Sequence, residues 1–237
     1  MGEFMKIGII FAMESELNAL KEYLEVIKVY DLFDLKFYEA RYKNISCILV
    51  ESGVGKVNSS RTTQILIDNM KVDYIFNIGV AGGISPDLKV LDIVIGEKLV
   101  QHDFDITAFN HEKGYVPNTG VFIESDTYLL NIAKSLITDT TYKVGIIASG
   151  DIFLTDSNMS KKINTKFQAL CAEMEGASIA MVCSLCHIPF LVIRSISDVV
   201  GSKNKLTYEE FLIESSKKVA LFMIKILNRL SEENKLK

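Results

Sequence analysis

The sequence has no excess of basic residues: 26 Lys and Arg stand against 30 Asp and Glu, giving a formal net charge of −4. Nucleic-acid-binding domains usually carry a basic face, and peripheral membrane proteins often carry polybasic segments. No apolar run approaches the ~20 residues of a membrane helix, and the apolar stretch IGIIFAM near the N-terminus is followed by acidic residues, unlike a signal peptide. We therefore expect a cytoplasmic protein with neither a nucleic-acid nor a membrane partner.

Cysteine is also scarce, and its placement argues against a metal or redox site. The four residues Cys47, Cys171, Cys183 and Cys186 lie in apolar stretches, which is typical of reduced thiols in a cytosolic protein. Cys183 and Cys186 have metal-ligand spacing but no second pair, so core packing is favoured. The run HDFD at 102–105 has side chains of metal-ligand type but lacks further ligands. We expect no metal and no cofactor.

Several catalytic and nucleotide-binding motifs are missing. No Ser lies in a G-x-S-x-G elbow, so the sequence does not indicate an esterase-type hydrolase. GVAGG at 79–83 is not the dinucleotide fingerprint, and SGVGKV at 52–57 is not a phosphate-binding P-loop. Taken singly, these glycine-rich stretches indicate only tight turns after strands.

Apolar runs of strand length alternate with runs of helical spacing, and no linker separates them. This pattern predicts one α/β domain with a largely parallel or mixed sheet. We place that domain at residues 5–230, interpret residues 1–4 as a cloning remnant, and residues 231–237 as a polar tail. The expected strands are 6–12, 34–42, 45–53, 72–83, 90–103, 142–150, 169–175 and 188–198; the expected helices are 14–27, 54–70, 127–137, 160–167, 176–187 and 206–230, with a loop at 104–124.

Charged residues and glycines follow most of the expected strands. Ligands of α/β sheets bind beyond the carboxyl ends of strands, so these residues are expected to converge on one site. Arg194 lies in an apolar run, where a cation is costly unless a carboxylate pairs with it. For the acids, structural interpretations stay open: Glu16 could stabilise a helix start, and Asp198 could cap a turn.

Seven motifs occur in order: AMESE (12–16), SGVGKV (52–57), GVAGG (79–83), QHDFDITAF (101–109), ASGDIF (148–153), AEMEGAS (172–178) and RSISD (194–198). Together they resemble the 5′-methylthioadenosine/S-adenosylhomocysteine nucleosidases of the purine and uridine nucleoside phosphorylase superfamily, from about Lys6 to Leu230. The resemblance implies a three-layer α/β/α domain around a mixed, barrel-like sheet, and a homodimer.

The resemblance also implies the reaction, which is hydrolysis of the N-glycosidic bond of methylthioadenosine, adenosylhomocysteine and 5′-deoxyadenosine. Asp198 would protonate adenine N7, and Glu16 would act as general base or orienting group for the attacking water. Such groups contribute ~10²–10⁴-fold each. Glu175 would accept hydrogen bonds from the ribose hydroxyls, with Met174 packed on the sugar.

Further side chains are assigned to the substrate by the same resemblance. Arg194 would pair with the carboxylates around the ribose and water, and Ser197 would hold Asp198. Glu173 would be a further substrate-binding residue. The base would lie against Phe153, the Leu154 backbone and the closely approaching Ala81 and Gly82. The pocket for the 5′-thio group, completed by the partner subunit of the dimer, would be lined by Val54, Ile106, Phe109, Pro117 and Tyr208.

Two departures from the family pattern bear on substrate preference. Val80 stands where many members have serine, and Tyr208 where phenylalanine is common. Three alternatives stay open: a nucleosidase acting on 6-amino-6-deoxyfutalosine, a phosphorolytic relative, and a nucleoside-binding protein. The acidic FAMESE stretch disfavours phosphate as nucleophile because carboxylates repel it, and a binding protein needs no acid–base pair.

Overall fold

In the computed structural model, which describes residues 5–199 and 208–234 without the side chains of residues 208–210, five strands close into a barrel. β10 pairs in parallel with β5 and antiparallel with β6, β8 pairs in parallel with both β6 and β9, and β9 pairs antiparallel with β5. The barrel strands are β5 (Tyr74–Gly83), β6 (Ile93–Gln101), β8 (Tyr142–Ser149), β9 (Ala169–Glu173) and β10 (Phe190–Val199).

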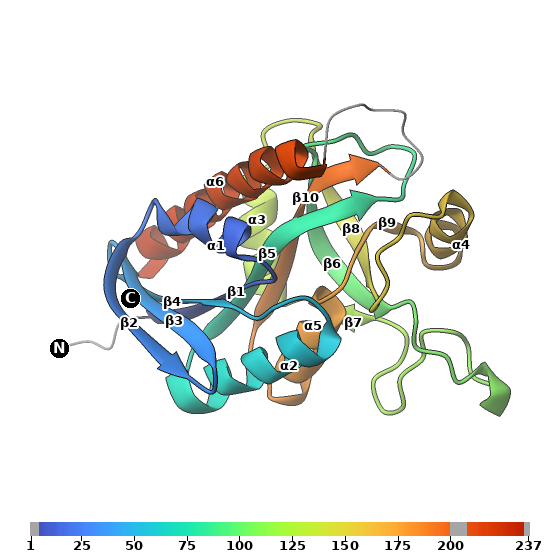
Figure 1. Ribbon diagram of the computed structural model, residues 1–237, viewed down its shortest axis with the longest axis horizontal. Helices are drawn as coiled ribbons and strands as arrows, with labels where there is room; N and C mark the ends of the chain where they lie inside the picture. Colours follow the sequence, from blue (N-terminus) through green and yellow to red (C-terminus); the bar gives the residue numbers. More distant parts are fainter. Residues whose placement is uncertain (1–4, 200–207, 235–237) are drawn as a thin grey trace.

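A second set of strands extends the sheet outward from β5. The added strands follow the order β1 (Met5–Phe11), β4 (Ile45–Glu51), β3 (Leu35–Tyr42) and β2 (Glu25–Leu32), while the short β7 (Ile123–Glu124) pairs with β6. β1 runs parallel to both β4 and β5, and the two outer strands are antiparallel. Figure 1 shows β2 and β3 at one end of the molecule and the barrel toward the other.

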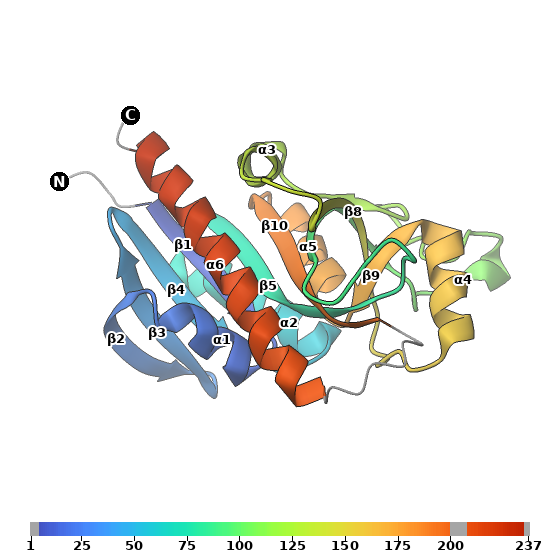
Figure 2. The same cartoon turned by 90° about the horizontal axis from the view of Figure 1, so that it is seen from above.

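Helices cover both faces of the sheet, as Figures 1 and 2 show. On one face α1 (Glu14–Lys21), α3 (Thr127–Ser135) and α6 (Tyr208–Asn234) share one apolar cluster with the strands. On the other face α2 (Lys56–Ile65) and α5 (Gly176–Leu185) share a second cluster. α4 (Ser157–Phe167) packs beside β9. Because both faces are covered, the inner strands are continuous apolar runs, and the predicted three-layer α/β/α domain with a barrel-like sheet is confirmed.

The helix predicted over residues 14–27 is wrong in its second half. α1 ends at Lys21, and residues 25–32 form β2. The apolar spacing of Leu17, Leu20 and Leu24 fits a helix, but Val26, Ile27 and Val29 are β-branched residues that favour a strand. Phe33 and Asp34 have φ of 52° and 59°, which forms the two-residue hairpin loop joining β2 to β3.

α6 is longer than its apolar spacing predicts. It continues to Asn234, so residues 231–234, expected in a polar tail, are helical. Ser231 is buried, its hydroxyl donates to Asn44 Oδ1, and its carbonyl accepts from Asn44 Nδ2 at 3.3 Å. These polar contacts hold the last turn against the β3–β4 turn, where hydropathy alone gives no signal. Residues 1–4 lie outside the described residues, and within the described part of the chain no helix is long and apolar enough to cross a membrane.

Candidate active site

The carboxyl ends of several strands meet at one pocket. It is closed by the segment after β1, the start of α2, the end of β5, the segment after β8, and the ends of β9 and β10. Its lining residues are Ala12, Met13, Glu16, Val54, Val80, Ala81, Gly82, Ile84, Ile152, Phe153, Leu154, Ala172, Glu173, Met174, Glu175, Ser197 and Asp198. The lining is mostly apolar with a few acids, which is the usual character of a small-molecule site.

Glu16 is a buried carboxylate held by backbone amides. It is the third residue of α1, and its Oε2 accepts hydrogen bonds from Ala12 N at 3.0 Å and Met13 N at 3.1 Å. Its Oε1 accepts one from Val80 N at 2.9 Å, across the pocket wall. The residue thus caps its own helix, as the structural interpretation of Glu16 predicts, and it also lines the pocket.

Burial raises the pKa of Glu16, and the nearby Arg194 charge and the three amides only partly offset that rise. A carboxylate with a raised pKa is a better proton acceptor than an ordinary one. The close approach also requires glycine at position 79, because a Cβ there would lie 2.5 Å from Glu16 Oε1.

Arg194 lies beneath the pocket with 1% of its surface exposed, and it has the carboxylate partner that its apolar setting predicts. Its Nη2 pairs with Glu173 and lies 3.9 Å from Glu175 Oε2. Its Nη1 donates to Asn77 O at 3.2 Å. One guanidinium therefore balances two buried carboxylates at the pocket floor.

The two carboxylates have different surroundings and different acidities. Glu173 accepts hydrogen bonds from Gly176 N at 2.8 Å and Glu175 N at 3.0 Å, at the start of α5, and one from the Ser149 hydroxyl. Burial opposes ionisation of Glu173, but Arg194 and these donors hold its pKa below the usual value. Glu173 is therefore a positioning group for α5 and Arg194.

Glu175 is the carboxylate left for a ligand. Its Oε1 accepts a hydrogen bond from Gly55 N at 2.9 Å. Burial and the neighbouring negative charge of Glu173 raise its pKa to about 7. A carboxylate of this kind gains from hydroxyl donors that replace lost water.

Asp198 lies near the end of β10, beside a bulge. The register with β5 shifts between Ile196 and Asp198, so that Ser197 is an extra residue in the strand. Bulges re-aim side chains, and here the two consecutive residues Ser197 and Asp198 both line the pocket. The Ser197 hydroxyl donates to Asp198 Oδ1 at 2.8 Å, which fixes one oxygen and leaves the other for a ligand.

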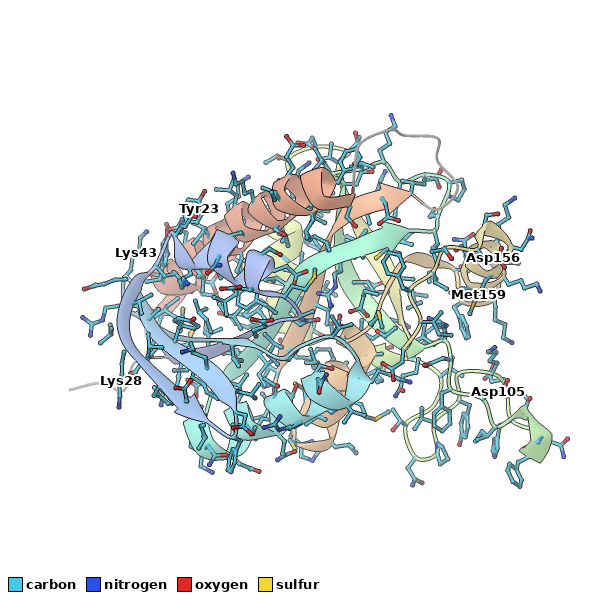
Figure 3. All side chains as sticks on the ribbon, in the orientation of Figure 1. Tyr23, Lys28, Lys43, Asp105, Asp156 and Met159 are labelled. Carbon is cyan, nitrogen blue, oxygen red and sulfur yellow. The ribbon has the colours of Figure 1, made fainter. Side chains whose placement is uncertain are left out.

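Most of the residues assigned from the motifs line this pocket, but the 5′-thio set is split. Val54 lines it, whereas the lining does not include Ile106, Phe109 or Pro117. Phe109 is 75% exposed. These three residues belong to the segment between β6 and β7, which projects from the barrel in Figure 1 and carries Asp105 in Figure 3. Tyr208 opens α6, and its side chain lies outside the described residues.

Some lining residues were not assigned from the sequence. Ala12 and Met13 lie within the AMESE motif, so their position was visible there but their role was not. Ile84 and Ile152 follow strand ends and look like ordinary core residues. Among the described residues, no group of three His, Cys, Asp or Glu side chains is arranged to hold a metal ion.

Comparisons with known proteins agree with this geometry. Residues 6–232 match the sequence profile of the Phosphorylase superfamily. An aminodeoxyfutalosine nucleosidase from Campylobacter jejuni is 38% identical over 228 residues, covering 95% of this chain and 100% of the relative. A 5′-methylthioadenosine/S-adenosylhomocysteine nucleosidase from a Geobacillus species is 38% identical over 232 residues, covering 96% and 100%.

A solved structure of a related enzyme has a similar fold. The 5′-methylthioadenosine/S-adenosylhomocysteine nucleosidase of Helicobacter pylori, bound to butyl-thio-DADMe-Immucillin-A, has a TM-score of 0.90 and 34% identity, covering 96% of this chain and 100% of that one. The chain belongs to the phosphorylase superfamily. The resemblance of its motifs to the nucleosidases of that superfamily is confirmed over nearly the whole length.

Replacing Arg194 with methionine is expected to destabilise the fold by about 3–5 kcal/mol at pH 7, because Glu173 and Glu175 would stay buried without their cation. The pKa of Glu173 would then rise above its unfolded value. Stability from such a group is present below the unfolded pKa and is lost as pH rises, so the deficit should shrink between pH 7 and pH 5. Urea unfolding at both pH values measures this.

The matched control is Arg229→Met, because Arg229 pairs with Glu233 at 2.9 Å in an exposed i,i+4 pair on α6. Its loss should cost at most about 0.5 kcal/mol. Equal unfolding midpoints for the two variants would contradict the structural role given to Arg194.

Proposed function

We propose that the protein hydrolyses the N-glycosidic bond of 5′-methylthioadenosine and S-adenosylhomocysteine, and also of 5′-deoxyadenosine, releasing adenine and the 5′-substituted ribose. The observation that carries this proposal is the pairing of Glu16 and Asp198 in one pocket with a third carboxylate, Glu175. The similarity to nucleosidases over 96% of the chain supports it.

Each carboxylate has a separate task in the proposed reaction. Asp198 gives its proton to N7 of adenine as the bond to the ribose breaks, so that the base leaves neutral. Glu16 accepts a proton from the water that attacks the ribosyl carbon. Glu175 accepts hydrogen bonds from the ribose hydroxyls. The positive charge of Arg194 offsets the repulsion between the neighbouring carboxylates.

The charges of the pocket favour water over phosphate as nucleophile. The described lining contains four acids and no lysine or arginine, and Arg194 is already engaged by Glu173 and Glu175. A phosphate entering this site would meet carboxylates and no free cation. A phosphorolytic reaction is therefore disfavoured on electrostatic grounds.

The adenine is placed against Phe153, the Leu154 backbone, Ala81 and Gly82. The proposed partner is a second copy of the chain in a homodimer. The exposed segment carrying Ile106, Phe109 and Pro117 would complete the 5′ pocket of the other subunit, with Val54 and Tyr208.

The proposed location of the protein is the cytoplasm, and its proposed role is the salvage of methionine. The four cysteines are free thiols, which suits the reducing cytoplasm.

A second candidate substrate is 6-amino-6-deoxyfutalosine. The relative from Campylobacter jejuni named for this activity is as similar, at 38% identity, as the methylthioadenosine nucleosidase from Geobacillus. The same acid–base set would serve both reactions, and only the 5′ pocket would differ. Comparing kcat/KM for the two substrates on one preparation would rank them.

The first experiment is incubation of the protein with 5′-methylthioadenosine, with and without phosphate, followed by mass identification of the sugar. We expect methylthioribose and adenine in both samples. Methylthioribose 1-phosphate that appears only with phosphate would overturn the hydrolytic proposal. A lack of adenine in both samples, and with the other 5′-substituted adenosines, would favour a nucleoside-binding protein.

A further inference from the structure

The first amides of α2 are bound by carboxylates from other parts of the chain. Gly55 precedes the helix with φ of 101° and offers no side chain to cap it. Gly55 N donates to Glu175 Oε1 at 2.9 Å, and Lys56 N donates to Asp151 Oδ1 at 2.8 Å. Helix starts leave amides unpaired and favour anions. The start of α2 therefore joins the ribose-side acid Glu175 to the segment that follows β8.

A second set of contacts closes a ring around that junction. The Lys56 ammonium lies 2.8 Å from Asp103 Oδ1, and the two side chains are only 18% and 17% exposed. Asp103 Oδ2 accepts a hydrogen bond from Asp151 N at 3.0 Å. Burial would raise the pKa of Asp103, but Lys56 and the Asp151 amide together lower it, so it is ionised at neutral pH. Lys56, Asp103 and Asp151, which we call the latch, thus contact one another in a closed cycle.

The backbone at the latch is built for close approach. A Cβ on Gly150 would lie 2.4 Å from His102 Nε2 and 3.1 Å from Asp103 Cγ. The segment ending β6 and the segment following β8 therefore touch at a position that only glycine fits. None of the three latch residues lines the pocket, yet Ile152, Phe153 and Leu154, which do, follow Asp151 directly.

We propose that the latch is a positioning device for the active site. It fixes Asp151, and with it residues 152–154 that line the base side of the pocket, against the start of α2, which holds Glu175 on the ribose side. The proposal rests on the nucleosidase function proposed above. Without the latch, the substrate must order this segment itself, and that ordering reduces affinity while the acid and base remain in place.

Asp103→Asn and Lys56→Met test the latch, because each removes the ion pair without touching the pocket. We expect KM for 5′-methylthioadenosine to rise about tenfold, with kcat within about threefold. The double variant should be no worse than either single variant, since the two residues act as one unit. The control is Lys98→Met, which breaks the Lys98–Glu124 pair of 3.0 Å between β6 and β7 and should leave KM unchanged.

Amide hydrogen exchange gives a second readout that does not depend on catalysis. In Asp103→Asn, exchange should quicken at residues 151–154 and at Lys56, while β1 and β5 keep their protection. Wild-type KM together with wild-type exchange at these amides would overturn the proposal. So would faster exchange across the whole sheet, which would make Asp103 a general stabilising residue. If the wild-type protein releases no adenine, the proposed function fails, and the exchange pattern alone decides the latch.

Discussion

Asp198→Asn is expected to lower kcat for 5′-methylthioadenosine by ~10²–10⁴-fold while the fold is kept. Asparagine has the shape of aspartate and can still donate a hydrogen bond to adenine N7, but it has no proton to give up as the glycosidic bond breaks. The Ser197 hydroxyl can bond to the amide oxygen as it does to Asp198 Oδ1. Substrate binding should therefore survive, as isothermal titration with the slowly cleaved nucleoside would measure.

A matched control for this substitution lies outside the pocket. Asp156 caps α4 by accepting a hydrogen bond from Asn158 N at 2.8 Å, and Figure 3 shows it beside Met159 on that helix. Asparagine caps helices as well as aspartate does, so Asp156→Asn should keep wild-type turnover. Near-normal kcat in Asp198→Asn would remove Asp198 as the proton donor.

Glu16→Gln is expected to lower kcat for hydrolysis by a similar factor, ~10²–10⁴-fold, while ligand binding persists. The amide cannot accept a proton from water. One end of glutamine can still accept from Ala12 N and Met13 N, but its NH₂ group would face Val80 N–H, so one hydrogen bond is lost at about 1 kcal/mol. Single-turnover kinetics and inhibitor titration separate the two effects.

The control is Glu14→Gln in the same turn of α1, because Glu14 is exposed and does not line the pocket. The kcat of this variant should be indistinguishable from that of the wild type.

The pH profile supplies a further check on the role of Glu16. Glu16 must be ionised to act, and its pKa is raised, so kcat/KM should fall with decreasing pH sooner than an ordinary glutamate of pKa about 4.3 would cause. Wild-type rates in Glu16→Gln would remove Glu16 as the base.

The barrel strands were the easiest part to predict from sequence. β5, β8 and β10 are apolar runs whose carboxyl ends carry the polar residues, and a sheet covered on both faces leaves few other arrangements. The end of α1 was mispredicted because Leu24 continues the helical spacing while belonging to the next segment. Neither spacing nor propensity reports that residues 33 and 34 form a hairpin loop. That outcome depends on pairing with β3, which is a long-range contact.

Within the site, sequence reasoning found the charged groups but not how they divide their work. The apolar setting of Arg194 predicted a carboxylate partner. The neighbouring sequence did not indicate that Glu173 would bind Arg194 most closely while Glu175 stays available. The difference arises because Glu173 accepts the first amides of α5, and Glu175 reaches across to Gly55. The bulge that lets Ser197 and Asp198 share the pocket is likewise set by the pairing of β10 with β5.

The three groups that hold Glu16 are all main-chain amides, those of Ala12, Met13 and Val80. Any amino acid other than proline supplies the same amide, so the side chains at these positions can change without moving the base. The side chains in this part of the pocket wall are thus independent of the hydrogen bonds that hold Glu16. Substitutions at positions 12, 13 and 80 can therefore reshape the wall beside Glu16 while its three hydrogen bonds are kept.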